Sequence, residues 1–171
     1  MTPLFTDDMK DFKTKKLAVC AVLAAVGLIF SYVEALIPFS PGLPGVKPGF
    51  ANIVVVFALY RFGGSYALAV NVVRIALAGL LFGSPFSALY ALAGGTVSLG
   101  AMILVRKAGI FSVTGTSMAG GVFHNLAQLL VAACVVQTVQ VISYLPVLIF
   151  SGVAAGIFNG IIAQLCLDRL K

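Results

Sequence analysis

A few polar and ionisable residues lie inside long apolar segments of this chain, where such residues are costly and are candidates for function. Asn71 and Arg74 lie near the middle of one apolar segment, and His124, Asn125 and Gln128 lie in another. Residues three or four positions apart share one face of a helix. An arginine can also bind a carboxylate or a phosphate through two parallel hydrogen bonds. The pattern predicts a polar pocket for a polar or anionic ligand.

Three further residues are candidates for the same pocket. Glu34 lies near the end of the first apolar segment, Asn52 begins the second, and Lys47 lies between them in the stretch 37–52. That stretch is rich in proline and glycine, which restrict the backbone or permit tight turns. We expect it to be a preshaped lid over the pocket, with Lys47 in contact with Glu34 or with the ligand.

Each of these residues also has a structural interpretation. Arg74 and Glu34 could form an ion pair that only holds two helices together. His124, Asn125 and Gln128 could be hydrogen-bonded between helices without any ligand. Lys47 could be a solvated loop lysine. The sequence leaves these alternatives open.

The composition is that of an integral membrane protein. The chain is 61% hydrophobic and 9% charged, with a mean hydropathy of +1.11. Soluble domains are about 45–50% apolar and about 25% charged. A nucleic-acid partner is not expected from the net charge of +6, because charge in such a chain has to be interpreted by position. The cysteines lie in apolar runs without metal-ligand spacing, so neither a disulfide nor a metal site is expected.

The apolar runs predict an all-α fold with six transmembrane helices. A membrane-spanning helix needs about 20 apolar residues, and the second run is too short to cross unaided. It must be completed by the stretch 37–52 or lie beneath it. The predicted spans are 17–37, 49–61, 65–82, 85–105, 117–136 and 144–167, and residues 1–16 are predicted to be a cytoplasmic N-terminal tail.

The basic residues predict the orientation. In a six-span topology, nine of them fall on one side and Lys47 is the single cation in the opposite loops. Cytoplasmic loops of membrane proteins carry an excess of lysine and arginine. Both termini are therefore expected in the cytoplasm of a bacterial cell, with the pocket facing outward. The nine are Lys10, Lys13, Lys15, Lys16, Arg61, Arg106, Lys107, Arg169 and Lys171.

Small residues recur at helical spacing in two segments. Gly152, Gly156 and Gly160 form one continuous small face, and Ala21 and Ala25 form a shorter one. Such faces allow two helices to approach closely. Packing inside the bundle is the simpler expectation, although such a face could also meet another membrane protein.

Several motifs together resemble a known family. They are "SYVEALIPF", "PGVKPGFANIVVVFAL", "VNVVRIALAGLLFGSPFSALYALAGG" and "AGGVFHNLAQLLVA", in that order. The chain resembles the Gx transporter family, also called heptaprenyl diphosphate synthase component I, from about Lys16 to its end. That family is similar to the substrate-binding S components of energy-coupling factor (ECF) vitamin transporters.

The resemblance implies an S-component-like bundle that captures a small substrate, such as a vitamin, a flavin or an isoprenoid-related molecule. It also implies docking through Ala21 and Ala25 on a transmembrane coupling protein that works with two cytoplasmic ATPases. The chain has no phosphate-binding G-x-x-x-x-G-K-[ST] motif of its own, so ATP hydrolysis would be the partners' task. The alternative is an accessory subunit of polyprenyl diphosphate or quinone synthesis, and a third possibility is an anchoring subunit without a ligand.

The enzyme name is not supported by a catalytic motif. Prenyl synthases hold Mg²⁺ with two aspartate-rich motifs, and the chain has a single match at Asp7-Asp8-Met9-Lys10-Asp11. The other acidic residues, Glu34 and Asp168, fall on opposite sides of the predicted membrane. We expect no catalysis by this chain alone, and no cofactor.

Overall fold

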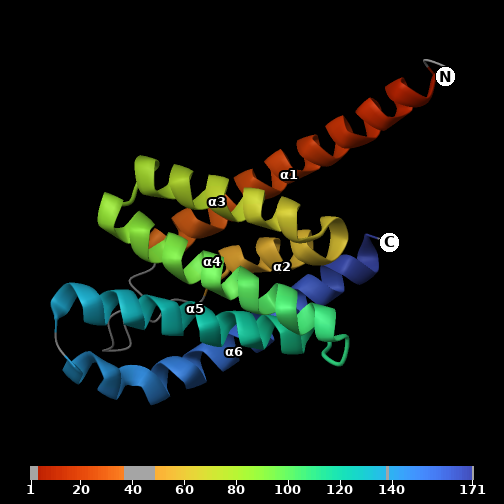
Figure 1. The fold of residues 1–171 in the computed structure, drawn as a ribbon. Helices are drawn as coiled ribbons and strands as arrows, with labels where there is room; N and C mark the ends of the chain where they lie inside the picture. The colour runs from red at the N-terminus through yellow and green to blue at the C-terminus, as the bar shows by residue number, and fades with distance from the viewer. Residues whose placement is uncertain (1–3, 37–48, 138, 171) are drawn as a thin grey trace.

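The computed structural model describes residues 4–36, 49–137 and 139–170, and every element in them is a helix. The prediction of an all-helical fold is therefore confirmed. Figure 1 shows α1 and α3 along one side of the bundle and the antiparallel pair α5 and α6 along the other. The elements are α1 (Leu4–Leu36), α2 (Ala51–Phe62), α3 (Gly64–Leu81), α4 (Pro85–Ala108), α5 (Val113–Val136), the 3₁₀ helix η1 (Val139–Tyr144) and α6 (Leu145–Arg169).

Five of the helices are long and apolar enough to cross a membrane, and α2 is a shorter apolar helix. The 12 residues of α2 reach only about 18 Å at 1.5 Å per residue. This helix packs against α1, α3, α5 and α6, and the side chains of Val56 and Ala58 are fully buried. A helix that is apolar on all sides is stable when protein surrounds it, so α2 forms the core of the bundle.

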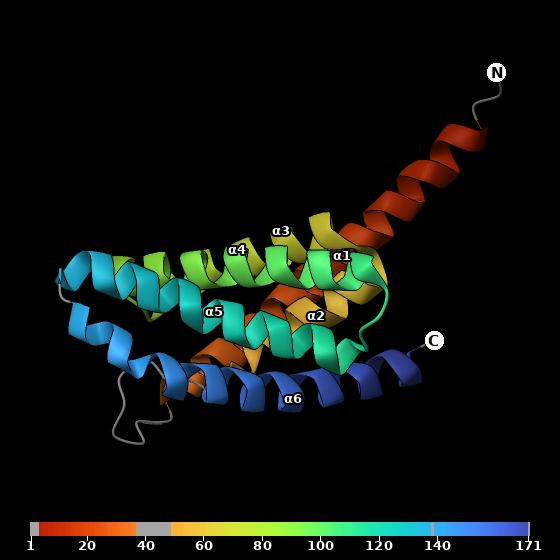
Figure 2. The same ribbon diagram turned by 60° about the horizontal axis from the view of Figure 1, so that its bottom comes forward.

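The largest departure from the predicted bounds is at the N-terminus. Helix α1 begins at Leu4 and runs for 33 residues, so most of the predicted tail continues the first helix. In Figure 2 this part projects beyond the bundle. The membrane-length portion begins at Thr14, close to the predicted start. A switch from polar to apolar side chains does not interrupt the backbone hydrogen bonding of a helix, because only glycine and proline are strongly unfavourable.

Capping residues explain other helix starts. The hydroxyl of Ser84 accepts a hydrogen bond from the amide of Ser87 at 3.1 Å, and the Ser87 hydroxyl accepts one from the amide of Ser84 at 2.9 Å. This capping box, followed by Pro85, begins α4 at the predicted residue. The Ser112 hydroxyl accepts from the Gly115 amide at 3.1 Å. Helix α5 therefore begins at Val113, four residues before the predicted 117.

The glycine face of α6 packs against α5. A Cβ built on Gly152 would lie 2.8 Å from the carbonyl oxygen of Gly121, and one built on Gly156 would lie 2.5 Å from the Cα of Met118. A Cβ on Gly160 would lie 2.6 Å from the Cα of Thr114. These distances require backbone-to-backbone contact. All three glycines thus pack inside the bundle, where they let α6 approach the backbone of α5.

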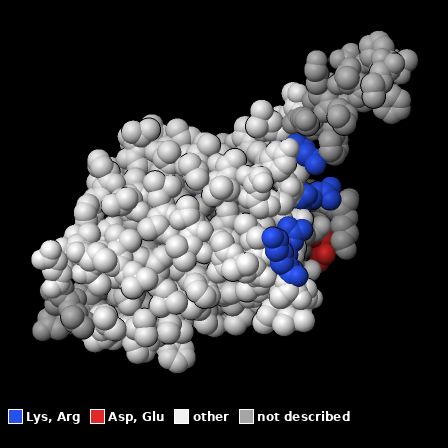
Figure 3. Space-filling model, in the orientation of Figure 1, with Lys and Arg blue, Asp and Glu red and all other residues white. Residues whose placement is uncertain are grey.

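The described basic side chains other than Arg74 lie at one end of the molecule. Figure 3 shows the lysine and arginine side chains of the visible face at this end. The guanidinium of Arg106 donates to the carbonyl of Leu59 and lies 4.9 Å from the centroid of the Tyr60 ring. We call this the cationic end.

Candidate functional site

A cavity of about 500 Å³ lies in the half of the bundle away from the cationic end, and all six α-helices contribute to its wall. Pockets of about 300–1,000 Å³ hold small molecules. Much of the wall consists of alanine and glycine, for example Ala78, Gly79 and Ala155, so the volume comes from short side chains. Of the predicted site residues, the wall includes Glu34, Asn52, Arg74, His124, Asn125 and Gln128.

Asn71 is not among the residues that line the cavity. It accepts a hydrogen bond from Arg74, so it can act on the cavity only through the arginine side chain. Lys47 and the part 37–48 of the predicted lid lie outside the described residues. Their proposed roles stay predictions.

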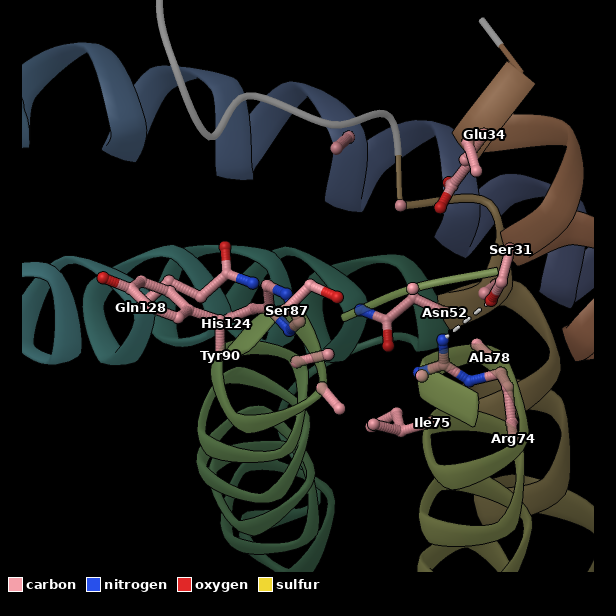
Figure 4. A pocket seen from close by; sticks show the side chains of 18 of the residues that line it. Ser31, Glu34, Asn52, Arg74, Ile75, Ala78, Ser87, Tyr90, His124 and Gln128 are labelled. Carbon is pink, nitrogen blue, oxygen red and sulfur yellow. Dashed lines mark hydrogen bonds between the residues drawn. The ribbon is translucent and has the colours of Figure 1, made fainter. Parts of the chain in front are cut away.

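Arg74 is the charged centre of the site. Its side chain is 9% exposed, and in Figure 4 its guanidinium points from α3 toward the cavity. Nη1 donates to the hydroxyl of Ser31 at 3.2 Å, and Nη2 donates to Oδ1 of Asn71 at 2.7 Å. Nε is buried and has no hydrogen-bond partner within the described part of the chain. The guanidinium is thus hydrogen-bonded to residues of α1 and α3, while its Nε has no acceptor among the described residues.

The environment of Arg74 contains one carboxylate, that of Glu34, which attracts the guanidinium electrostatically. Glu34 accepts a hydrogen bond from the backbone amide of Phe50. The direct hydrogen bonds of Arg74 go to Ser31 and Asn71. Glu34 thus combines attraction to Arg74 with a bond to the segment that begins α2.

Asn71 orients the arginine from within α3. Its side chain is fully buried, and its Nδ2 has no partner in the described residues. A Cβ on Gly95 of α4 would lie 2.6 Å from that Nδ2. Gly27 of α1 is similarly close to Arg74, because a Cβ there would lie 2.8 Å from the arginine Cδ. Two glycines on neighbouring helices therefore make room for this polar pair.

A second polar group faces the cavity from α4 and α5. Figure 4 shows His124, Gln128, Tyr90 and Ser87 on one side and Arg74 with Ser31 on the other. Gly94 makes room for this second group, since a Cβ on it would lie 2.9 Å from Cε1 of His124. The arrangement suits a ligand with an anionic group at one end and uncharged hydrogen-bonding groups at the other.

Asn125 has a structural role as well as a place in the wall. Its Nδ2 donates to the carbonyl of Leu148 at 2.7 Å and to the hydroxyl of Ser151 at 3.1 Å. These bonds connect α5 to α6. The alternative interpretation of Asn125, as a side chain hydrogen-bonded between helices, thus has direct support in the geometry. Gln128 lines the same cavity near His124.

Sequence reasoning missed several members of the site. The cavity is also lined by Ser31, Ser87 and Tyr90. Serine and tyrosine are ordinary residue types in membrane helices, so their presence in the sequence does not indicate a binding site. Asn159 is 2% exposed, and its Nδ2 donates to the carbonyl of Gly49 at 3.0 Å. The sequence does hold a signal for Asn159, because an amide inside a long apolar segment is costly and stands out as a polar residue of the last predicted span. Its contact connects α6 to the start of α2.

The remaining candidates lie elsewhere. Ala21 and Ala25 are exposed on α1, outside the cavity wall. Among the described residues, no group of three or more His, Cys, Asp or Glu side chains is placed to hold a metal ion.

The comparisons with known proteins bear on this site. The family model described as heptaprenyl diphosphate synthase component I matches residues 23–166, a range that includes the whole cavity wall. No match is found for this chain among curated proteins or among solved structures.

Proposed function

The chain belongs to the heptaprenyl diphosphate synthase component I family, and on that premise we propose that it is a non-catalytic membrane subunit that captures a small anionic or polar molecule for an ECF-type importer. The observation that carries this proposal is Arg74, a buried cation in the wall of a cavity, with Nε unpartnered among the described residues. Leaving a buried donor unsatisfied costs about 1–3 kcal/mol, and more when the group is charged. A bound carboxylate or phosphate would remove that cost.

The location of the cavity supports capture from outside the cell. The cavity residues occupy the ends of the helices opposite those that carry Lys15, Arg61, Lys107 and Arg169. If the cationic end faces the cytoplasm, as the positive-inside rule predicts, the site belongs to the outer half of the membrane. ATP-driven release would then need a coupling protein and ATPases, for which exposed Ala21 and Ala25 on α1 are the proposed contact.

Co-purification tests the binding step. The protein is extracted from its native membrane in mild detergent, and small molecules released by denaturation are identified by mass spectrometry. We expect an anionic molecule of vitamin or flavin size with the unmodified protein and at least about a tenfold lower yield with Arg74→Gln, because hydrogen bonds to charged groups contribute about 1.5–3 kcal/mol.

Lys107→Gln is the matched control, because it removes a cation from the exposed end of α4 without altering the cavity. It should retain the molecule. Equal occupancy of Arg74→Gln and the unmodified protein would refute the assignment of the ligand to Arg74. Absence of ATPase subunits from the same preparations would argue against the importer while leaving ligand binding intact.

The family name favours a second candidate function. The cavity and its arginine could hold the diphosphate of a prenyl molecule for a synthase. In that case a soluble synthase would co-purify, and prenyl transfer would require both proteins. Recovery of a prenyl diphosphate instead of a vitamin-like molecule would select this function over import.

A further inference from the structure

The main cavity has a carboxylate on the same side as its arginine. Glu34 of α1 and Arg74 of α3 both line it, and Figure 4 shows them together with Ser31 on one side. An anion bound to Arg74 would therefore lie near a negative charge of the protein. We propose that Glu34 determines the specificity of the Arg74 site by favouring a singly charged anion, such as a carboxylate, over a doubly charged phosphate. This inference rests on the proposed function, because it requires that Arg74 binds the charged group of the ligand.

Ser31 shows how near Glu34 lies to the arginine. Nη1 of Arg74 donates to the hydroxyl of Ser31 at 3.2 Å. Glu34 follows Ser31 by three positions on α1, and such residues are neighbours on a helix, with about 5–6 Å between their Cβ atoms. The Glu34 carboxylate also attracts the guanidinium electrostatically. Its charge thus acts at the place where a ligand would meet Arg74.

A second contact fixes the position of the Glu34 carboxylate. It accepts a hydrogen bond from the backbone amide of Phe50, the N-cap residue of α2. A negative charge is stabilised at the N-terminus of a helix. The same segment is bound to α6, because Nδ2 of Asn159 donates to the carbonyl of Gly49 at 3.0 Å. Glu34 is therefore held against a segment that another helix also fixes, and we expect it to stay in place when an anion enters.

The charge of the ligand decides how strongly Glu34 opposes it. Arginine binds carboxylates and phosphates alike through paired hydrogen bonds. Arg74 attracts a doubly charged group more strongly than a singly charged one, but Glu34 repels the doubly charged group more strongly by the same law. The carboxylate thus cancels much of the advantage that the arginine alone would give a phosphate. The greater cost of removing a double charge from water then favours the singly charged group.

Phenyl sulfate and phenyl phosphate test this role, because they share one shape and differ in charge. The phenyl ring suits a cavity that Phe82 and Tyr90 line. The full-length protein is reconstituted in nanodiscs of neutral phosphatidylcholine, and both dissociation constants are measured by calorimetric titration at constant ionic strength. The pH is about 8, where a phosphate ester is doubly charged because its second pKa is about 6. We expect tighter binding of the sulfate by the unmodified protein. Tighter binding of the phosphate would overturn the proposal without the need for any variant.

Glu34→Gln removes the charge and keeps an oxygen that can accept from the Phe50 amide. We expect the ratio of the two dissociation constants to shift toward the phosphate by roughly 5- to 50-fold, the effect of one additional unit of charge near the carboxylate. Glu34→Asp keeps the charge, so the preference for the sulfate should persist even if both probes bind more weakly. An unchanged ratio in Glu34→Gln would refute the role of Glu34.

Asp168→Asn is the matched control, because it removes a carboxylate from the exposed end of α6, outside the cavity wall. Its ratio should equal that of the unmodified protein. Equal shifts in Asp168→Asn and Glu34→Gln would indicate a general effect of net charge and would also refute the proposal.

Arg74→Gln separates this inference from the proposed function. It should weaken the binding of both probes. If it weakens neither, Arg74 does not bind the charged group, and the proposed function and this inference fail together. If it weakens both while Glu34→Gln leaves the ratio unchanged, the Arg74 site stands and the specificity role of Glu34 alone is refuted.

Discussion

Gly27 on α1 and Arg74 on α3 share one small space at the wall of the main cavity. A Cβ on Gly27 would lie 2.8 Å from Cδ of Arg74 and 3.5 Å from its Cγ. The absence of a side chain at Gly27 is therefore what lets the stem of the arginine pass between the two helices. The guanidinium then reaches Ser31, one helical turn further along α1.

Gly27→Ala should displace this arginine. We expect a loss of about 1–3 kcal/mol from overpacking, reduced by up to about 1 kcal/mol because alanine favours the helix. Gly100→Ala is the control, since a Cβ at Gly100 meets nothing within 4 Å. Thermal unfolding in detergent checks both. In an Arg74→Ala background the cost of Gly27→Ala should vanish; if the cost persists there, the clash is not with the arginine.

Asn71→Asp should weaken the binding of an anionic ligand without unfolding the bundle. The new carboxylate would stand where Oδ1 now accepts from Arg74 at 2.7 Å and would neutralise the guanidinium locally. Affinity for the co-purifying molecule should fall by at least about tenfold, given 1.5–3 kcal/mol for hydrogen bonds to charged groups. Calorimetric titration measures this loss. An unchanged affinity together with an unchanged melting temperature would remove Arg74 from the ligand site.

Gly121→Ala should separate α5 from α6. A Cβ on Gly121 would lie 2.2 Å from the carbonyl oxygen of Gly152, and a backbone atom cannot rotate away as a side chain can. We expect destabilisation of about 1–3 kcal/mol or more, measured by unfolding in increasing denaturing detergent. Gly100→Ala again serves as control, and a Gly121→Ala protein as stable as that control would contradict the close contact.

Asn159→Leu should loosen the segment that begins α2. The variant keeps the approximate volume but removes the bond to the Gly49 carbonyl, which also accepts from the amide of Asn52 at 2.8 Å. A net hydrogen bond of about 0.5–1.5 kcal/mol corresponds to an increase of roughly 2- to 13-fold in amide exchange at Asn52. Gln164→Leu, five residues further along α6, should leave that exchange unchanged. The same rate in both variants would mean that Asn159 does not hold this segment.

The predicted orientation is open to chemical labelling. In a background with Cys20, Cys134 and Cys166 replaced by alanine, Ser84→Cys should react with a membrane-impermeant maleimide on intact cells. Ile110→Cys, exposed beside the cationic end, should react only after permeabilisation. The reverse pattern would place the main cavity toward the cytoplasm and exclude capture from outside.

Part of the site could be predicted from the sequence, because each charged or polar residue inside a membrane segment is by itself a candidate for function. Arg74, His124 and Gln128 stand out in apolar helices, and the structure brings them to one cavity. The same reasoning could not separate Asn125, which bonds α6, from Gln128, because both are amides on α5. Ser31 and Tyr90 gave no comparable signal, since hydroxyl-bearing residues are ordinary in membrane helices.

The positions of the long helices along the chain follow from the local sequence. Apolar length predicts the long helices, while serine caps and prolines explain where α4 and α5 begin, because these effects act within a few residues along the chain. Packing across helices determines the rest. Gly27, Gly94 and Gly95 become part of the site only because arginine, histidine and asparagine side chains from other helices fill the space beside them, and such contacts depend on distances between segments that no spacing along the chain encodes.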